Sequence, residues 1–173
     1  MDKPWNWGRW GLSSNPSISR EFIEKHIERV WEWGHYGLSR NPSITPEFIE
    51  KHIEQPWVWG WGGLSENPSI SQEFIEKHIE QPWDWDGLSV NPSITQDFIE
   101  KHIEQPWDWL SMNFEQKFSN LRHISPELIE KHIRSSGAKK VRLKNDRFTW
   151  GWAGLSSNPS ISPEFIEKYI DKP

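Results

Sequence analysis

One segment recurs along the chain and constrains its fold more strongly than any other feature. At residues 41–54 it reads NPSITPEFIEKHIE; near-copies occupy residues 15–28, 67–80, 91–104 and 158–171, and a degenerate copy occupies 123–134. A period of roughly 25 residues is typical of repeat architectures, in which each unit buries its apolar side only against its neighbours. The sequence therefore predicts a single repeat domain over residues 1–173.

Six units are predicted from one apolar position that every copy contains. This position is occupied by Phe22, Phe48, Phe74, Phe98, Leu128 and Phe165. The first three intervals are regular, and the last two are longer because they contain an irregular segment at 114–123 and a basic insertion at 135–147. The predicted units span residues 4–29, 30–55, 56–81, 82–105, 106–134 and 148–173.

The recurring segment carries the signals of a short helix. Thr45 is the predicted N-cap, Pro46 fits the first helical position, and Glu47 places negative charge at the positive end of the helix dipole. Phe48 and Ile49 begin an apolar arc that faces the neighbouring units. The corresponding caps in the other units are Ser19, Ser71, Thr95, Ser125 and Ser162. Because so short a helix is marginal alone, stacking must stabilise it.

The opposite face of this helix is charged. Glu47 and Lys51 have the spacing and order of a favourable ion pair one turn apart on the same helix. Glu50 and its equivalents are interpreted as a solvated helix face, because they lie opposite the apolar arc and form no paired-carboxylate pattern.

A second element is predicted between the tryptophan pair of each unit and the Asn-Pro step. Residues that lie between the two tryptophans, such as Asn6 and Asp84, are good N-caps for a second short helix. Asn41 precedes a proline and is predicted to end such a helix in a left-handed backbone conformation. The predicted fold is therefore mainly α, a tandem-repeat solenoid of short helices. The alternative is a leucine-rich-repeat-like α/β solenoid in which Trp-x-Trp forms a short strand.

Tryptophan supplies the apolar side chains that the chain otherwise lacks. The hydrophobic fraction is only 34%, yet the chain contains 14 tryptophans. A buried aromatic side chain hides about 150–250 Å² of surface, so the tryptophan pairs are predicted to fill a layered aromatic core. The alternative is a platform for carbohydrates or nucleobases, with Asp84 and Asp108 as polar partners. A third aromatic set in the variable spacer is predicted to contact a partner: Trp10, Tyr36, Trp61 and Trp152.

Histidine also recurs once per unit, as His26, His52, His78, His102 and His132. Stacked units could align these side chains, and neutral imidazole binds metals. No second ligand at the His-x-x-x-His spacing completes a site, however, so the histidines are predicted to pack half-buried between units. The sequence predicts no metal and no cofactor.

The charge distribution is uneven. The net charge of −5 argues against nucleic-acid binding by the chain as a whole. Residues 134–147 nevertheless contain six basic residues and one acidic residue. This segment is interpreted as a solvated loop, with phosphate or an acidic protein as the alternative contact. Its candidate binding residues are Lys139, Lys140, Arg142, Lys144 and Arg147.

The repeated motifs resemble those of one known group of proteins. Trp-Asp-Trp at 83–85 and 107–109, Leu-Ser-x-Asn-Pro-Ser-Ile-Thr/Ser and Glu-Phe-Ile-Glu-Lys-His-Ile are similar to the tandem repeats of giant DNA viruses of the mimivirus kind. The resemblance covers nearly the whole chain apart from about 114–123 and 135–147. It implies a viral protein that acts in the host cell cytoplasm or in the virion, and it carries over no catalytic residue.

These observations predict a non-enzymatic structural and interaction scaffold. No nucleophile motif, phosphate-binding loop or paired-carboxylate pattern occurs, and the chain has no cysteine, no secretory signal and no membrane-length apolar run. The first and last residues are in phase and neither end carries a polar capping unit, so self-association or a protein partner is predicted to cover the ends. The alternative function is a nucleic-acid-associated virion protein that uses residues 134–147.

Overall fold

The computed structural model describes residues 5–108, 125–135 and 160–169. In these ranges the chain forms α-helices and single turns of 3-10 helix, and no strand. The prediction of a mainly α fold is confirmed. The leucine-rich-repeat-like alternative is wrong for the described part of the chain, because the Trp-x-Trp segments at 31–33 and 57–59 have no strand partner and no regular structure.

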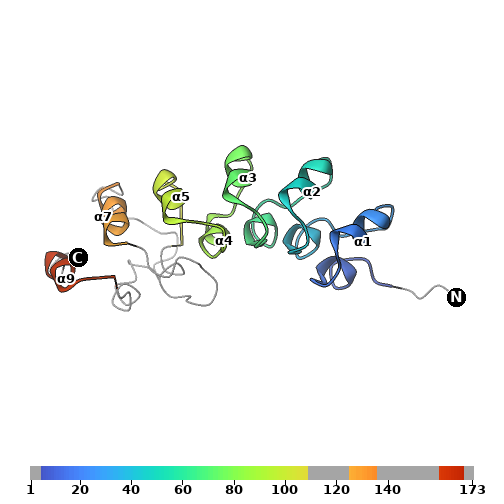
Figure 1. Cartoon of the computed structure of the whole chain (residues 1–173), viewed down its shortest axis with the longest axis horizontal. Helices are drawn as coiled ribbons and strands as arrows, with labels where there is room; N and C mark the ends of the chain where they lie inside the picture. The colour runs from blue at the N-terminus through green and yellow to red at the C-terminus, as the bar shows by residue number, and fades with distance from the viewer. Residues whose placement is uncertain (1–4, 109–124, 136–159, 170–173) are drawn as a thin grey trace.

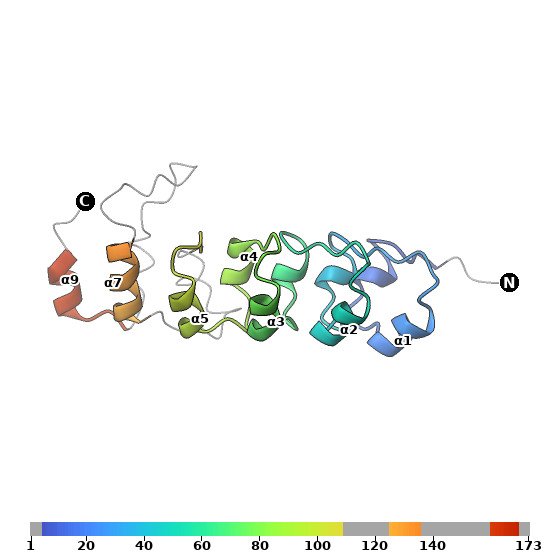
Figure 2. The same ribbon diagram turned by 90° about the horizontal axis from the view of Figure 1, so that it is seen from above.

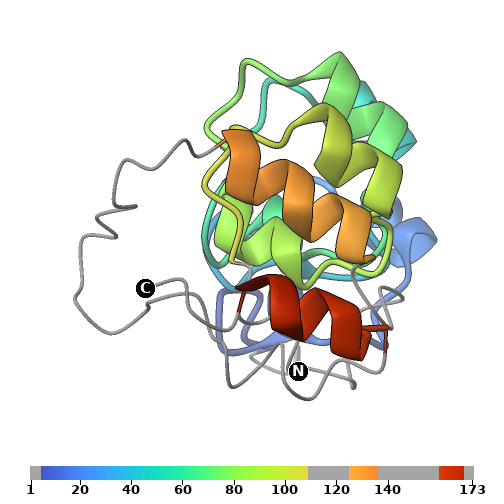
Figure 3. The same ribbon diagram turned by 90° about the vertical axis from the view of Figure 1, so that its left-hand side faces the viewer.

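The main helices lie side by side in an arched row (Figure 1). Seen from above, the same row runs the length of the described structure (Figure 2), and in the end view α7 and α9 point in nearly the same direction (Figure 3). The row contains α1 (Arg20–Lys25), α2 (Pro46–Lys51), α3 (Gln72–Lys77), α5 (Gln96–Lys101), α7 (Pro126–Ser135) and α9 (Pro163–Tyr169).

Side-chain caps begin most of these helices as the sequence predicts. Ser19 Oγ accepts a hydrogen bond from the Phe22 amide at 3.2 Å, and Ser71, Thr95, Ser125 and Ser162 make the same contact in their own units. Thr45 differs, because its hydroxyl makes no capping hydrogen bond and lies 3.5 Å from Nη1 of Arg20 on the preceding helix. Pro46 occupies the first turn of α2, as predicted.

The second element differs from the predicted helix. In the first three units it is one turn of 3-10 helix: η1 (Leu12–Ser14), η2 (Leu38–Arg40) and η3 (Leu64–Glu66). The Leu38 amide donates to the Glu32 carbonyl at 2.8 Å, which closes the spacer into a loop. A Cβ on Gly37 would lie only 2.1 Å from that same carbonyl oxygen, so glycine is required where the backbone closes on itself.

Of the four second elements that the structure describes, only that of the fourth unit is the predicted α-helix. Helix α4 (Trp85–Ser89) begins immediately after Asp84, whose Oδ2 accepts a hydrogen bond from the Gly87 amide at 3.3 Å. The spacer in this unit is shorter than in the first three, which leaves no room for the glycine-closed loop. The predicted N-cap role of Asp84 is confirmed.

The asparagine of the Asn-Pro step is extended and not left-handed in the first three units. Asn41 has φ −71° and ψ 125°, because a following proline disfavours helical backbone at the residue before it. The Asn41 amide group is buried and donates across the junction to the Asn15 carbonyl at 3.1 Å. Asn67 and Asn91 repeat this contact to Asn41 and Asn67 at 3.0 and 3.1 Å. The prediction of a helix-terminating left-handed residue is therefore wrong.

The core is a layered aromatic interior shared between neighbouring units. In the second unit, Trp33 stacks near Phe48 and meets Trp57 edge-on, with ring centroids 5.1 Å apart. The Trp57 Nε1 donates to the His52 carbonyl at 2.8 Å, which satisfies the indole N–H inside the core. Trp31, Trp83 and Trp107 make the equivalent bond in their junctions at 2.9 Å. The core interpretation of the tryptophan pairs is confirmed for these residues.

A buried serine links each second element to the next unit. Ser65 Oγ donates to the Trp59 carbonyl at 2.8 Å and accepts from the Asp84 amide at 2.9 Å. Ser13, Ser39 and Ser89 make the same pair of contacts. One hydroxyl therefore satisfies a backbone carbonyl of one unit and an amide of the next, which fixes the register of the stack.

Candidate interaction surfaces

An exposed aromatic ledge, formed by Trp10, Tyr36 and Trp61, runs across the first three units. Trp10 is 79% exposed and Trp61 is 62% exposed, whereas Tyr36 between them is half-buried. The Trp10 and Tyr36 rings stack with centroids 6.4 Å apart, and the Tyr36 and Trp61 rings meet edge-on at 5.3 Å. The sequence predicted these residues as contact residues, and the structure brings them together on one surface.

Unusual backbone geometry holds the ledge in place. Tyr36 has φ +53°, a left-handed conformation that is rare for an aromatic residue, and its amide donates to the Gly62 carbonyl at 2.8 Å. Gly62 has φ +68°, and its amide donates to Oε1 of Glu66 at 2.8 Å. Neighbouring spacer loops are thus tied to each other by main-chain bonds. Strain held at a surface loop is a feature associated with functional sites.

Basic side chains border the ledge. The Arg40 guanidinium lies 5.7 Å from the Tyr36 ring centroid and that of Arg9 lies 6.0 Å away, both within cation–π range. Arg40 also pairs with Glu66 at 2.9 Å, so its orientation is fixed from two sides. The ledge therefore offers flat aromatic area beside guanidinium groups.

The remaining predicted contact residues lie outside the described residues. They are Trp152 and the basic set Lys139, Lys140, Arg142, Lys144 and Arg147. The irregular segment at 114–123 and the insertion at 135–147 also fall outside, except for Ser135 at the end of α7. The proposed roles of these residues stay predictions.

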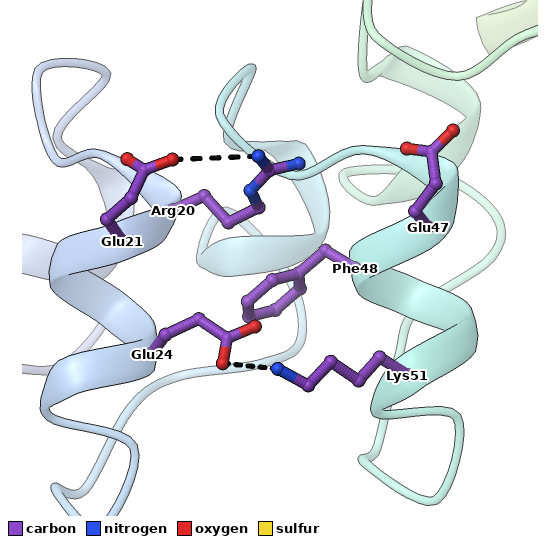
Figure 4. A pocket seen from close by; sticks show the side chains of 6 residues that line it. All are labelled: Arg20, Glu21, Glu24, Glu47, Phe48 and Lys51. Carbon is purple, nitrogen blue, oxygen red and sulfur yellow. Dashed lines mark hydrogen bonds and ion pairs between the residues drawn. The ribbon is translucent and has the colours of Figure 1, made fainter.

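The helix face carries a column of ion pairs that crosses every junction of the row. Lys51 Nζ lies 2.6 Å from Oε2 of Glu24 on the preceding helix, and Lys77 pairs with Glu50 at 2.7 Å in the same way (Figure 4 shows the first of these pairs). The later pairs are Lys101–Glu76, Lys131–Glu100 and Lys168–Glu130. The predicted pair of Glu47 and Lys51 within one helix does not form, because Lys51 reaches across the junction.

This pairing also corrects the interpretation of Glu50 as part of a simple solvated face. Its carboxylate accepts a hydrogen bond from Lys77, and that contact lowers the pKa of Glu50 below the ordinary value. The hydrogen bond from Lys51 lowers the pKa of Glu24 for the same reason. The groove between α1 and α2 is open, and Glu24 and Lys51 pair within it beside Phe48, so it offers no enclosed site (Figure 4).

The recurring histidines pack against aromatic rings at the junctions. The His52 ring lies 4.7 Å from that of Phe48, and the same pair recurs in the units of His26, His78 and His102. His102 Nε2 lies 2.8 Å from Oε1 of Glu76. The equivalent distances to a carboxylate are 3.5 Å for His52 and 3.7 Å for His78, and these two nitrogens make no hydrogen bond within the described part of the chain.

Three further findings concern the residues that the structure describes. Among them, no group of three or more histidine, aspartate or glutamate side chains is placed to hold a metal ion. Asp86, which the sequence did not single out, lies in α4, where burial together with the charges of Asp84 and Asp108 raises its pKa. Within the same ranges, no helix is both long and apolar enough to cross a lipid bilayer.

Comparison with known proteins returned no similarity to report. No protein-family model matches the chain, and neither the curated proteins nor the solved structures searched contain a match.

Proposed function

We propose that this chain is a non-enzymatic scaffold whose aromatic ledge binds a protein partner. The observation that carries the proposal is the contrast between two sets of tryptophans. Trp31, Trp57, Trp83 and Trp107 are buried in the junctions, whereas Trp10 and Trp61 lie open on the surface. Exposed indoles that the core does not use mark interaction surfaces in soluble proteins.

The composition of the ledge favours a protein as the partner. Tryptophan, tyrosine and arginine are the residues most enriched among those that dominate protein–protein binding energies. Tyr36 lies between two indoles and beneath Arg40, so the ledge combines all three residue types on a rigid loop framework.

The wider architecture that we propose is a solenoid of six units. The hydrogen bonds and ion pairs that join α1 to α2 recur along the row as far as α9, where Lys168 reaches Glu130 at 2.7 Å. A solenoid of this kind supplies an elongated surface along which a partner can bind. The motif resemblance supports a viral origin, with action in the host cell cytoplasm or in the virion.

Affinity capture with three forms of the protein tests the ledge. The Trp10→Ala/Trp61→Ala variant removes its two exposed indoles, and Ile53→Ala removes an exposed apolar side chain from a helix elsewhere. A partner that binds the ledge will be retained by the wild type and by Ile53→Ala, and will be lost from the double variant at least about tenfold. If the wild type and both variants capture a purified partner equally well, the proposal is contradicted.

We propose nucleic-acid binding through residues 134–147 as the second candidate function. Its support is the concentration of six basic residues and one acidic residue in this segment of an otherwise acidic chain. Binding to a duplex oligonucleotide should fall steeply with added salt and disappear when Lys139, Lys140, Arg142 and Lys144 are replaced by alanine. Binding that survives this replacement contradicts the candidate.

A further inference from the structure

The two ends of the helix row expose apolar side chains that are buried at the equivalent positions between them. Phe22 of α1 is 36% exposed, whereas Phe48 of α2 is 2% exposed, because its ring points from α2 toward α1 (Figure 4). Ile166 of α9 is 50% exposed, whereas Ile129 of α7 is fully buried. Among the described residues, α1 has no neighbouring helix on the side that Phe22 faces, and α9 has none beside Ile166.

The ion-pair column is also incomplete at both ends, with opposite charges. Lys25 occupies the position of Lys51 and Lys77, yet no carboxylate pairs with it among the described residues. Glu167 occupies the position of Glu130, and no lysine pairs with it within the same ranges. One end therefore presents an unmatched cation beside an exposed ring, and the other end presents an unmatched anion beside an exposed aliphatic side chain.

We propose that a second copy of this chain docks head to tail, with α9 of one molecule against α1 of the next. The contact repeats the geometry of the internal junctions: Glu167 pairs with Lys25 as Glu130 pairs with Lys168, and Phe22 and Ile166 become buried. A second copy is the expected partner because the exposed face of α9 matches the faces that cover the following helix at the internal junctions. The exposed face of α1 likewise matches the faces that are covered there.

Such a contact joins two different surfaces, so it is heterologous and can propagate. Repetition gives an open filament, or a closed ring if the curvature of the row returns to its start. The contact goes beyond the proposed partner binding and uses none of its residues, because the aromatic ledge lies on the spacer loops and the docking surfaces lie on α1 and α9.

Charge reversal at the two ends tests this contact in the full chain. Lys25→Glu and Glu167→Lys each place like charges at the junction, and sedimentation velocity over a range of protein concentrations measures association. Each variant alone should associate roughly fivefold to tenfold more weakly than the wild type. An equimolar mixture of the two restores an opposite-charge pair at every junction and should regain wild-type association. Glu54→Lys, which reverses an exposed charge away from both ends, is the matched control and should behave as wild type.

Further measurements distinguish loss of self-association from loss of partner binding at the ledge and from misfolding of a variant. Circular dichroism and the melting temperature of each variant, measured at a concentration where it is monomeric, report whether it folds normally. Ile166→Ser weakens association by removing apolar area without changing charge. A wild type that stays monomeric at high concentration overturns the proposal, as does a mixture that associates no better than its components. The Trp10→Ala/Trp61→Ala variant should associate normally, so loss of partner capture and loss of self-association are distinguishable.

Discussion

Asn67 shows how one side chain joins two units. Its amide group is fully buried and donates to the carbonyls of Ser39, Asn41 and Ile44 at 3.2, 3.0 and 3.2 Å, and its Oδ1 accepts from the Ser69 amide at 2.9 Å. An unpaired backbone carbonyl in this position would lose its hydrogen bonds with water and gain nothing in return. The recurring asparagine is therefore a structural requirement of the stack.

Replacing this asparagine by aspartate tests that role. Asn67→Asp keeps the acceptor but removes the donor and buries a carboxylate against three carbonyl oxygens, so it should lower the free energy of unfolding by about 2–5 kcal/mol. Asn15 is the matched control, since it is exposed and uses only its Oδ1, which accepts from Ser17. Urea denaturation of both variants measures the difference. Equal stability of the two would contradict this role for Asn67.

Gly37 tests the closed spacer loop. A Cβ there would lie 2.1 Å from the Glu32 carbonyl oxygen and 2.9 Å from the carbonyl carbon, and these main-chain atoms leave little room for adjustment. Gly37→Ala should destabilise the protein by about 1–3 kcal/mol through overpacking. Gly34→Ala in the same loop is milder, because its Cβ would meet the movable end of the Glu32 side chain at 3.0 Å. A smaller loss of stability for Gly37→Ala than for Gly34→Ala would be inconsistent with the loop closure.

At the scale of elements, the sequence predicts the main helices well because their signals are local. The N-cap, the proline at the first helical position and the apolar arc all lie within a few residues of one another. In α3, for example, Ser71 caps the helix through the Phe74 amide, and Phe74 is buried, as the sequence predicts. The 3-10 form of the second element in the first three units is missed because its geometry depends on contact with the next unit. Ser65, for example, accepts from an amide 19 residues away, and no local pattern encodes that distance.

The ion-pair column is missed for the same reason. Spacing within one helix favours an ion pair between Glu47 and Lys51. Stacking instead brings the Glu24 carboxylate within 2.6 Å of the Lys51 ammonium, so Lys51 pairs with Glu24. Of the candidate contact residues, the exposed aromatics could be predicted from their place in the variable spacer. Their assembly into one ledge could not, because it depends on the left-handed Tyr36 backbone.

The column of ion pairs predicts that the protein loses stability as the pH falls. Contacts with lysine on the next helix lower the folded-state pKa of Glu24 and Glu50 below the ordinary value of 4.5. A lowered carboxyl pKa contributes stability that is present above about pH 4.5 and is lost as the pH falls through the folded-state value. The melting temperature should therefore decline below pH 4.5. In a Lys51→Met/Lys77→Met variant part of this decline should disappear, and an unchanged acid slope would argue against the column.

At the scale of the whole molecule, the described helices are short and depend on each other. Helix α2 spans only Pro46–Lys51, a length that is not stable in water alone. Its apolar residues Phe48 and Ile49 are buried by neighbouring units. Trp57 belongs to the start of the next unit, and its ring packs edge-on against Phe48. Stability in such a stack is approximately the sum of unit and junction terms, so it grows with the number of units.

The most direct measurement compares an excised unit with the intact chain. A peptide of residues 30–57 contains α2 and the tryptophans that flank it, Trp31, Trp33 and Trp57, but has no neighbouring unit to bury Phe48 or to pair with Asn41. Far- and near-ultraviolet circular dichroism of this peptide should show an unfolded chain, while the full protein shows helix and ordered aromatic rings. A peptide that folds alone with fixed aromatic signals would contradict the claim that neighbouring units build a shared interior.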